Sequence, residues 1–303
     1  MNNTFTLRSG VKIPQIGFGP GMFDYKRIPY KSTLPALTWR VWNKLVSQRQ
    51  QRERFIDSIA NALKLGFRLL DYSITYGNLP YIREAIKRSE VNRDDLFLTT
   101  RIGNKEQFKG DIRESFLRNL DVWGIEKIDL LQFHWPVPDK YISTWEEMIR
   151  LKDEGFVKVL GTANCHPHHI EALKYSTGIL PEVNQVEVHP LFTQKPLLEY
   201  CKKNDIMVEA YTPVARFDDR LVRLPLLKGL ERKYGKSFVQ IILRWHIQNG
   251  VIPVVRTLTP SHQKSNINIF DFEITQEDMD LIDRINIDSR LRYNPDNCDF
   301  SIL

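Results

Sequence analysis

Residues 69–77, Leu69-Leu70-Asp71-Tyr72-Ser73-Ile74-Thr75-Tyr76-Gly77, begin as an apolar run and end in polar side chains. Short continuous apolar runs are typical of parallel strands that are buried on both faces. The stretch therefore predicts a strand whose C-terminal end carries a carboxylate, Asp71, and a phenol, Tyr76. Taken alone, this spacing favours a structural role. A phenol has a reference pKa of about 10 and becomes a usable proton donor only beside a cation, which must come from elsewhere in the fold.

The alternation of apolar runs with helical periodicity continues along the chain and predicts eight β/α units after an N-terminal β-hairpin with its turn at Ser9-Gly10. Eight such units favour a (β/α)8 TIM barrel, with a doubly wound open sheet as the alternative. No linker divides the chain, so residues 1–303 are expected to form a single domain. The predicted strands are Ile13–Phe18, Phe67–Ser73, Leu96–Ile102, Ile128–Trp135, Val157–Asn164, Glu182–Val188, Ile206–Thr212 and Val251–Thr257. The predicted helices are one ending at Gly66, those at Tyr81–Ser89, Asp111–Trp123, Tyr141–Glu154, Pro167–Tyr175, Lys195–Asn204, Phe238–Asn249 and Pro260–Ile269, and an accessory helix at Phe270–Ile287.

Composition excludes several classes of protein. No run of eighteen apolar residues is present, so no membrane span is predicted, and the N-terminus lacks the features of a signal peptide. The three cysteines have no framework spacing and read as free thiols, which favours a cytoplasmic location. The net charge of +6 comes without a nucleic-acid-binding motif, so no nucleic-acid partner is expected.

Polar residues stand at or near the predicted strand ends, where a barrel places its chemistry. No G-x-G-x-x-G motif follows a strand, so a Rossmann cofactor site is not predicted. The polar residues in question are Asp71, Tyr76, Arg101, His134, Asn164, Gln185, Tyr211, Arg256 and Thr257.

Several stretches together resemble the aldo-keto reductase family over nearly the whole chain. They are Ile16-Gly17-Phe18-Gly19, Leu70-Asp71 with Tyr76-Gly77-Asn78, residues 128–136 (IDLLQFHWP), residues 161–164 (GTAN), residues 184–190 (NQVEVHP), residues 210–213 (AYTP) and residues 240–245 (QIILRW). The resemblance implies a barrel enzyme that reduces an aldehyde or ketone to an alcohol by hydride transfer from a nicotinamide nucleotide.

The family's catalytic Asp, Tyr, Lys and His fall on Asp71, Tyr76, Arg101 and His134. The resemblance assigns proton donation to Tyr76, positioning of the carbonyl to His134, and tuning of the phenol to the other two. Arginine stands where the family has lysine. Its positive charge is expected to lower the pKa of Tyr76, although its planar fork can also turn towards Asp71.

The resemblance also implies a cofactor site in which Tyr211 stacks on the nicotinamide. NADPH is the expected cofactor and NADH is possible, because Arg256 suits a 2′-phosphate whereas His262 replaces a second arginine. Ala163 replaces a serine that would assist Asn164. The implied cofactor residues are Asn164, Gln185, Tyr211, Thr212, Arg256, Thr257, His262 and Asn266.

The stretch Pro20–Gln50 is basic and rich in aromatic residues, and it follows the first strand. It is either a solvated helix and loop or a cover on the catalytic face that favours anionic carbonyl substrates. Phe23, Trp135 and Cys298 are the expected substrate contacts, and Phe300 is a further candidate. The tail from Asp288 to Leu303 either lies near the site or packs on the barrel's side.

The cluster Cys165-His166-Pro167-His168-His169 contains metal-ligating residue types. Neighbouring residues at a helix start are not expected to converge on one ion, and no distant partner is apparent, so no metal site is predicted.

A second function stays open beside the reductase. The chain would then bind the nucleotide with little turnover, as a sensor or partner subunit, because Arg101 and Ala163 depart from the family pattern.

Overall fold

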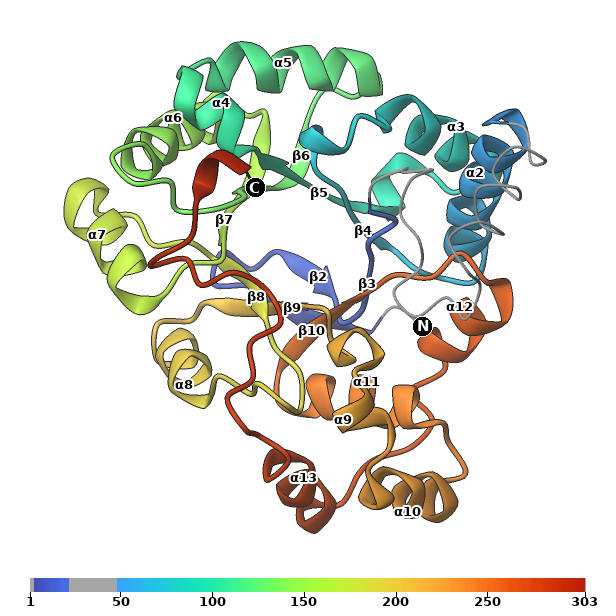
Figure 1. Ribbon diagram of the computed structural model, residues 1–303. Helices are drawn as coiled ribbons and strands as arrows, with labels where there is room; N and C mark the ends of the chain where they lie inside the picture. The colour runs from blue at the N-terminus through green and yellow to red at the C-terminus, as the bar shows by residue number, and fades with distance from the viewer. Residues whose placement is uncertain (1–2, 22–47, 303) are drawn as a thin grey trace.

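A closed barrel of eight parallel strands occupies the centre of the computed structural model, which describes residues 3–21 and 48–302 (Figure 1). The strands follow the order β10-β3-β4-β5-β6-β7-β8-β9, so the first strand closes against the last. This closure confirms the predicted (β/α)8 barrel and excludes the open sheet. The strand bounds are β3 Gly17–Phe18, β4 Leu69–Asp71, β5 Phe97–Ile102, β6 Ile128–Phe133, β7 Val157–Ala163, β8 Val183–Glu187, β9 Met207–Tyr211 and β10 Val251–Val255.

Helices surround the barrel, and their ends carry the expected signals. Ser237 and Gln240 form a reciprocal capping box at the start of α11, and Gly124 ends α5 in the left-handed conformation. Among the described residues, no helix has the length and apolar character needed to cross a bilayer. The bounds are α2 Gln48–Lys64, α3 Leu79–Ser89, α4 Asn104–Lys109, α5 Ile112–Trp123, α6 Tyr141–Asp153, α7 Pro167–Thr177, α8 Lys195–Lys203, α9 Asp219–Val222, α10 Pro225–Tyr234, α11 Phe238–Gln248, α12 Pro260–Ile267 and α13 Gln276–Asp283.

Some predicted boundaries are corrected. Helices α4, α9 and α10 were not expected, and the accessory helix is confined to α13, because Thr275 caps its first turn. The predicted first strand divides into β2 (Lys12–Pro14) and β3. Most of the stretch at 20–50, including the predicted substrate contact Phe23, lies outside the described residues.

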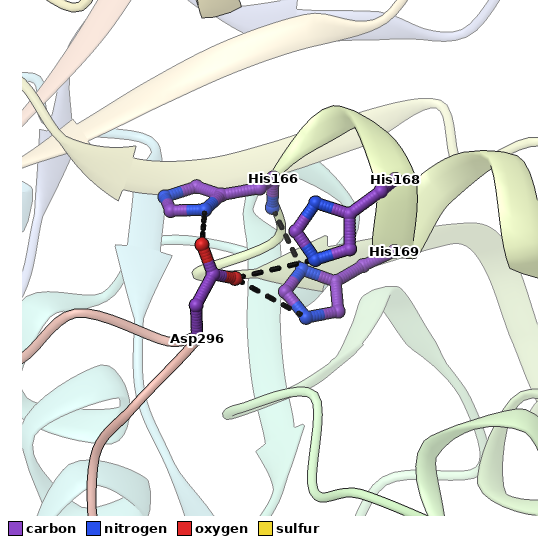
Figure 2. Close-up of side chains that lie close together, drawn as sticks. All are labelled: His166, His168, His169 and Asp296. Carbon is purple, nitrogen blue, oxygen red and sulfur yellow. Dashed lines mark hydrogen bonds and ion pairs between the residues drawn. The ribbon is translucent and has the colours of Figure 1, made fainter.

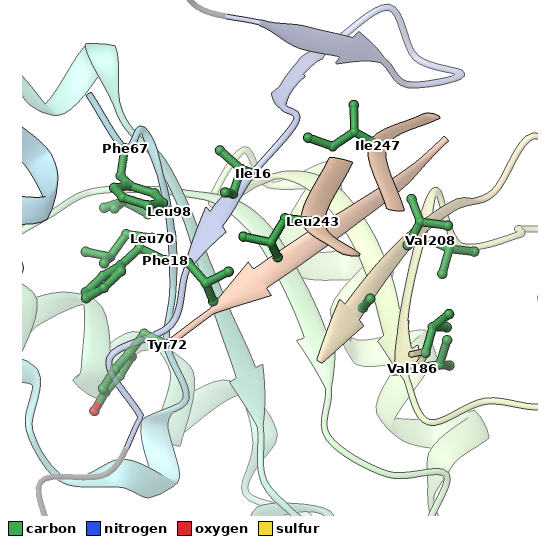
Figure 3. Close-up of a cluster of buried hydrophobic side chains, with 14 of the residues drawn as sticks. Ile16, Phe18, Phe67, Leu70, Tyr72, Leu98, Val186, Val208, Leu243 and Ile247 are labelled. Atoms are coloured by element: carbon green, nitrogen blue, oxygen red, sulfur yellow. The ribbon is translucent and has the colours of Figure 1, made fainter. Parts of the chain in front are cut away.

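The main hydrophobic core lies between the outer faces of the strands and the helices (Figure 3). Phe18, Leu70 and Leu98 on neighbouring strands are fully buried in it, as is Leu243 on α11. Alternate residues of each strand therefore point outward into this core, and the remainder point into the barrel.

The predicted hairpin closes the N-terminal end of the barrel. Strands β1 (Thr4–Thr6) and β2 (Lys12–Pro14) pair antiparallel around the turn at Ser9-Gly10. Leu7 and Ile13 are buried against residues near the strand starts, such as Leu69 and Val183. The predicted polar residues at the strand ends thus lie at the opposite, C-terminal end of the barrel.

The C-terminal tail crosses that opposite end, drawn in red in Figure 1. Glu187 at the end of β8 accepts the backbone N–H groups of Leu291 and Arg292 at 2.6 and 2.9 Å. Further along, the backbone oxygen of Phe300 accepts a hydrogen bond of 3.0 Å from Asn104 Nδ2. Of the two predicted courses, the tail takes the one near the site.

Candidate active site

The four predicted catalytic residues belong to three neighbouring β/α units. Asp71 ends β4, Arg101 lies on β5 and His134 follows β6. Tyr76 stands on the short 3-10 helix Ile74–Tyr76. Ser73 is the N-cap of this helix, and Gly77 is its C-cap with a φ of 65°. A left-handed residue at this position favours glycine, so the sequence Tyr76-Gly77 fixes the turn that carries the phenol.

Arg101 is almost fully buried, and its described hydrogen bonds fix the guanidinium against three groups. Nη2 donates to the carboxylate of Asp71 and to Gln185 Oε1, the latter at 2.7 Å, while Nη1 donates to the backbone oxygen of Tyr72 at 3.3 Å. A lysine ammonium is a compact charge, whereas this fork reaches several acceptors at once. Arginine in place of lysine at position 101 therefore links Asp71 and Arg101 to Gln185.

The expected effect of Arg101 on Tyr76 is corrected by the burial of the phenol. Burial raises the pKa of Tyr76, and the positive charge of Arg101 opposes that rise without reversing it. Burial also raises the pKa of Asp71, again against Arg101. Arginine keeps its charge in proteins, so Arg101 is a buried cation in contact with the carboxyl group of Asp71.

His134 has the electrostatics of a neutral ring. Burial, followed by the charge of Arg101, lowers the pKa of His134 to about 3. At neutral pH the imidazole is therefore uncharged, and one ring nitrogen can donate a hydrogen bond to an oxygen in the barrel mouth.

Glu209 was not anticipated, yet it belongs to the same network inside the barrel. Its Oε2 accepts hydrogen bonds from Gln185 Nε2 at 2.8 Å and Gln132 Nε2 at 3.4 Å. Burial, reinforced by the negative charge of Asp71, raises the pKa of Glu209 to about 7. Glu209 lies two residues before Tyr211 on β9, and residues two apart on a strand point to the same face. This spacing was the signal in the sequence that could have placed Glu209 inside the barrel.

Two of the predicted nicotinamide ligands are linked by hydrogen bonds at the barrel mouth. Tyr211 Oη donates to Asn164 Oδ1 at 2.7 Å, and Asn164 Nδ2 donates to the backbone oxygen of His134 at 2.9 Å. The amide of Asn164 keeps one further proton and one further lone pair for a ligand. Gln185 faces Arg101 and Glu209 instead, so its predicted contact with the cofactor competes with these two partners.

The predicted phosphate end lies between β10 and the start of α12. A methyl group placed on Gly21 would come within 3.0 Å of the Arg256 guanidinium carbon, so glycine allows this close approach. Thr212 has a φ of 50°, and its buried hydroxyl has no hydrogen-bond partner in the described part of the chain. Strain and an unpaired hydroxyl at one position are consistent with a ligand-binding loop. The arginine, the unpaired hydroxyl and the N-terminus of α12 are each groups of the kind that bind phosphate.

The other predicted phosphate-end residues are placed differently from one another. Thr257 is partly exposed and its hydroxyl accepts the backbone N–H of Thr259 at 3.2 Å, His262 is exposed, and Asn266 is buried on α12.

Trp135, a predicted substrate contact, meets the tail residues Cys298 and Phe300. Trp135 is buried, with its ring centroid 6.4 Å from that of Phe300. Cys298 packs against the small cluster that contains these two rings. An apolar wall thus stands beside His134 at the mouth.

The structure brings three of the neighbouring histidines closer together than the sequence led us to expect. One side-chain ligand atom from each of His166, His168, His169 and Asp296 lies within 4.8 Å of the others (Figure 2). His166 precedes helix α7 in an extended conformation, so its ring returns over the first turn. Asp296 comes from the tail, and no local signal in the sequence pairs it with residues more than a hundred positions away. Cys165, predicted to be a free thiol, is buried.

The chain is similar to proteins of known class along nearly its whole length. Residues 38–287 match the profile described as the Aldo/keto reductase family. Glyoxal reductase of Bacillus subtilis is 37% identical over 296 residues, covering 98% of this chain and 97% of that protein. Methylglyoxal reductase DkgA of Escherichia coli K12 is 33% identical over 267 residues, covering 88% and 94%.

Solved structures agree with these matches. An aldo/keto reductase from Brucella melitensis superposes with a TM-score of 0.81 at 33% identity, covering 94% of this chain and 100% of that chain. A Bombyx mori aldo-keto reductase solved in complex with NADP gives a TM-score of 0.82 at 26% identity, covering 98% and 96%.

Proposed function

Because the chain belongs to the aldo/keto reductase family of NAD(P)H-dependent oxidoreductases, we propose that it reduces a small aldehyde or ketone with NADPH, using Tyr76 as proton donor. The observation that carries this proposal is the buried Arg101–Asp71 ion pair beside a phenol held on a rigid turn. Relatives named glyoxal and methylglyoxal reductases favour short carbonyl compounds as substrates.

Each side chain has a role that follows from its charge state. The neutral His134 ring donates a hydrogen bond to the carbonyl oxygen and so orients it. Tyr76 holds its proton at neutral pH because a phenol has a reference pKa of about 10, and burial raises the pKa of Tyr76 further. It gives that proton to the oxygen as negative charge develops there. Arg101 stabilises the resulting phenolate, and Asp71 holds Arg101 in place.

NADPH supplies the hydride when it is bound. Asn164 and Tyr211 are the groups proposed to hold its nicotinamide, and Thr212 and Arg256 those proposed to hold its phosphates. The guanidinium of Arg256 suits a 2′-phosphate, which favours NADPH over NADH. His262 is exposed and stands where the family resemblance places a second arginine. It adds less positive charge at that position, so the difference in affinity between NADPH and NADH should be smaller. The partly exposed Thr257 and the buried Asn266 are the remaining residues proposed for this end of the cofactor site.

A preference for anionic carbonyl compounds depends on residues 20–50, most of which lie outside the described residues, and stays a prediction. A second candidate function is nucleotide binding with weak turnover. It is favoured by the commitment of the Arg101 fork to Asp71 and Gln185, which leaves less of its charge directed at Tyr76.

One assay separates the two functions. NADPH absorbance is followed with glyoxal, methylglyoxal and larger aldehydes for wild type and Tyr76→Phe, and nucleotide binding is measured by quenching of protein fluorescence. The proposal requires turnover by wild type, loss of most turnover in Tyr76→Phe, and equal NADPH affinity in both. Tight NADPH binding without turnover of any aldehyde would favour the second function and overturn the first.

A further inference from the structure

The three histidines at the start of α7 and Asp296 on the tail meet beside the barrel mouth but outside the proposed reaction (Figure 2). Asp296 Oδ2 lies 2.8 Å from His166 Nδ1, and its Oδ1 lies 3.2 Å from His168 Nε2 and 3.7 Å from His169 Nε2. Imidazoles and a carboxylate are the ligands of choice for zinc and neighbouring divalent transition metals.

The spacing is close to that of a coordinated ion. Tetrahedral zinc with bonds of about 2.0–2.1 Å holds its ligand atoms about 3.3 Å apart. One carboxylate oxygen of Asp296, Oδ2, lies near this distance from His166 Nδ1, and the other, Oδ1, lies near it from His168 Nε2. Since all four ligand atoms fall within 4.8 Å of one another, the largest contraction needed is about 1.5 Å. The His168 side chain is 63% exposed and can make that movement at little cost.

Hydrogen bonds distinguish ligands from supporting residues. His169 Nδ1 accepts the backbone N–H of His166 at 3.1 Å, so the neutral ring carries its proton on Nε2, which faces Asp296. His169 therefore suits a hydrogen-bond donor that orients the carboxylate rather than a metal ligand.

Arg290 stands where it can oppose a metal. Its Nη2 lies 3.3 Å from His166 Nε2, and arginine can only donate. A metal on His166 Nδ1 would place the ring proton on Nε2, facing the guanidinium. The guanidinium also stacks on Phe192, 4.6 Å from the ring centroid, which holds it nearby. Binding therefore requires Arg290 to turn away.

We propose that His166, His168 and Asp296 bind one divalent transition metal ion of the zinc type, with water completing its coordination and His169 orienting Asp296. The metal then fastens the tail to α7. Asp296 follows the anchor at Leu291 and Arg292 and precedes Phe300, which packs on Trp135. A metal bound here restrains the tail around Asp296, and the tail carries Cys298 and Phe300 to the apolar wall beside Trp135.

Zinc chloride titrated into tag-free, chelator-treated protein tests the site by calorimetry. Wild type should bind one zinc per chain, and Asp296→Asn and His168→Gln should each weaken that affinity by at least about tenfold. Arg290→Gln should strengthen it by about tenfold, because a glutamine oxygen can accept the proton on His166 Nε2. Asp299→Asn is the matched control, since it removes a neighbouring tail carboxylate, and Cys298→Ser excludes a thiol ligand. Both controls should bind zinc as wild type does.

Hydrogen exchange gives a second readout. Zinc should slow exchange of the amides at 291–299 in wild type and leave them unchanged in His168→Gln. The site is refuted if wild type binds no zinc at millimolar concentration, or if Asp296→Asn and His168→Gln keep wild-type affinity. Unchanged tail exchange at saturating zinc would refute the fastening of the tail.

Discussion

Substitution of Glu209 by glutamine should make the stability of the protein less dependent on pH. Glu209 is buried inside the barrel, accepts hydrogen bonds from Gln185 and Gln132, and shares its surroundings with the carboxylate of Asp71. Its Oε1 has no hydrogen-bond partner among the described residues. Glutamine retains the shape and the accepting oxygen, and it cannot become charged.

The magnitude follows from proton linkage. Burial raises the pKa of Glu209 from 4.5 to about 7, so the folded state holds a proton that the unfolded state has released between these pH values. The stabilisation is complete below pH 4.5 and is lost as the pH rises through 7. At about 1.4 kcal/mol per pH unit, this interval corresponds to about 3 kcal/mol of unfolding free energy. The Glu209→Gln variant should therefore gain about 3 kcal/mol relative to wild type between pH 4.5 and pH 8.

Urea denaturation of both proteins across this pH range measures the difference, in which groups that titrate equally in both cancel. Glu187→Gln is the control of opposite sign. Burial acts to raise the pKa of Glu187, but hydrogen bonds from His189 and the tail lower it overall, so its stabilisation is lost as the pH falls. A constant difference between wild type and Glu209→Gln at every pH would refute a raised pKa for Glu209.

Substitutions at three further positions test other parts of the structure. Arg101→Lys should keep or raise kcat, because an ammonium cannot bind Asp71 and Gln185 at once as the guanidinium does. Arg101→Met should lower kcat at least tenfold, because the positive charge is lost. Both are measured by steady-state kinetics with methylglyoxal, and an Arg101→Met variant as fast as wild type would remove Arg101 from the mechanism. Arg256→Ala should weaken NADPH by about tenfold or more and NADH little in fluorescence titrations, whereas equal losses would contradict a 2′-phosphate contact. Gly161→Ala should reduce the unfolding free energy by about 1–3 kcal/mol, because its methyl group would lie 2.8 Å from the backbone oxygen of Val183; an unchanged denaturation midpoint would contradict this packing.

The sequence by itself determined the barrel and the positions of the candidate catalytic groups. Alternating apolar runs and helical periods are local patterns, so they predict the β/α order, and barrel closure brings strand ends such as Asp71, Arg101 and His134 to one edge. Tyr76 followed from its spacing to Asp71 and from the family resemblance, both of which are read from the sequence.

Only the tertiary structure decided how those groups are paired. The guanidinium of Arg101 contacts Gln185 from a strand elsewhere in the barrel, and Glu209 acquires a raised pKa from burial beside Asp71. Asp296 meets His166 only because the tail crosses the mouth. Hydrogen bonds and pKa values depend on distance and burial in space, and residues far apart in the chain carry no local pattern that records either quantity.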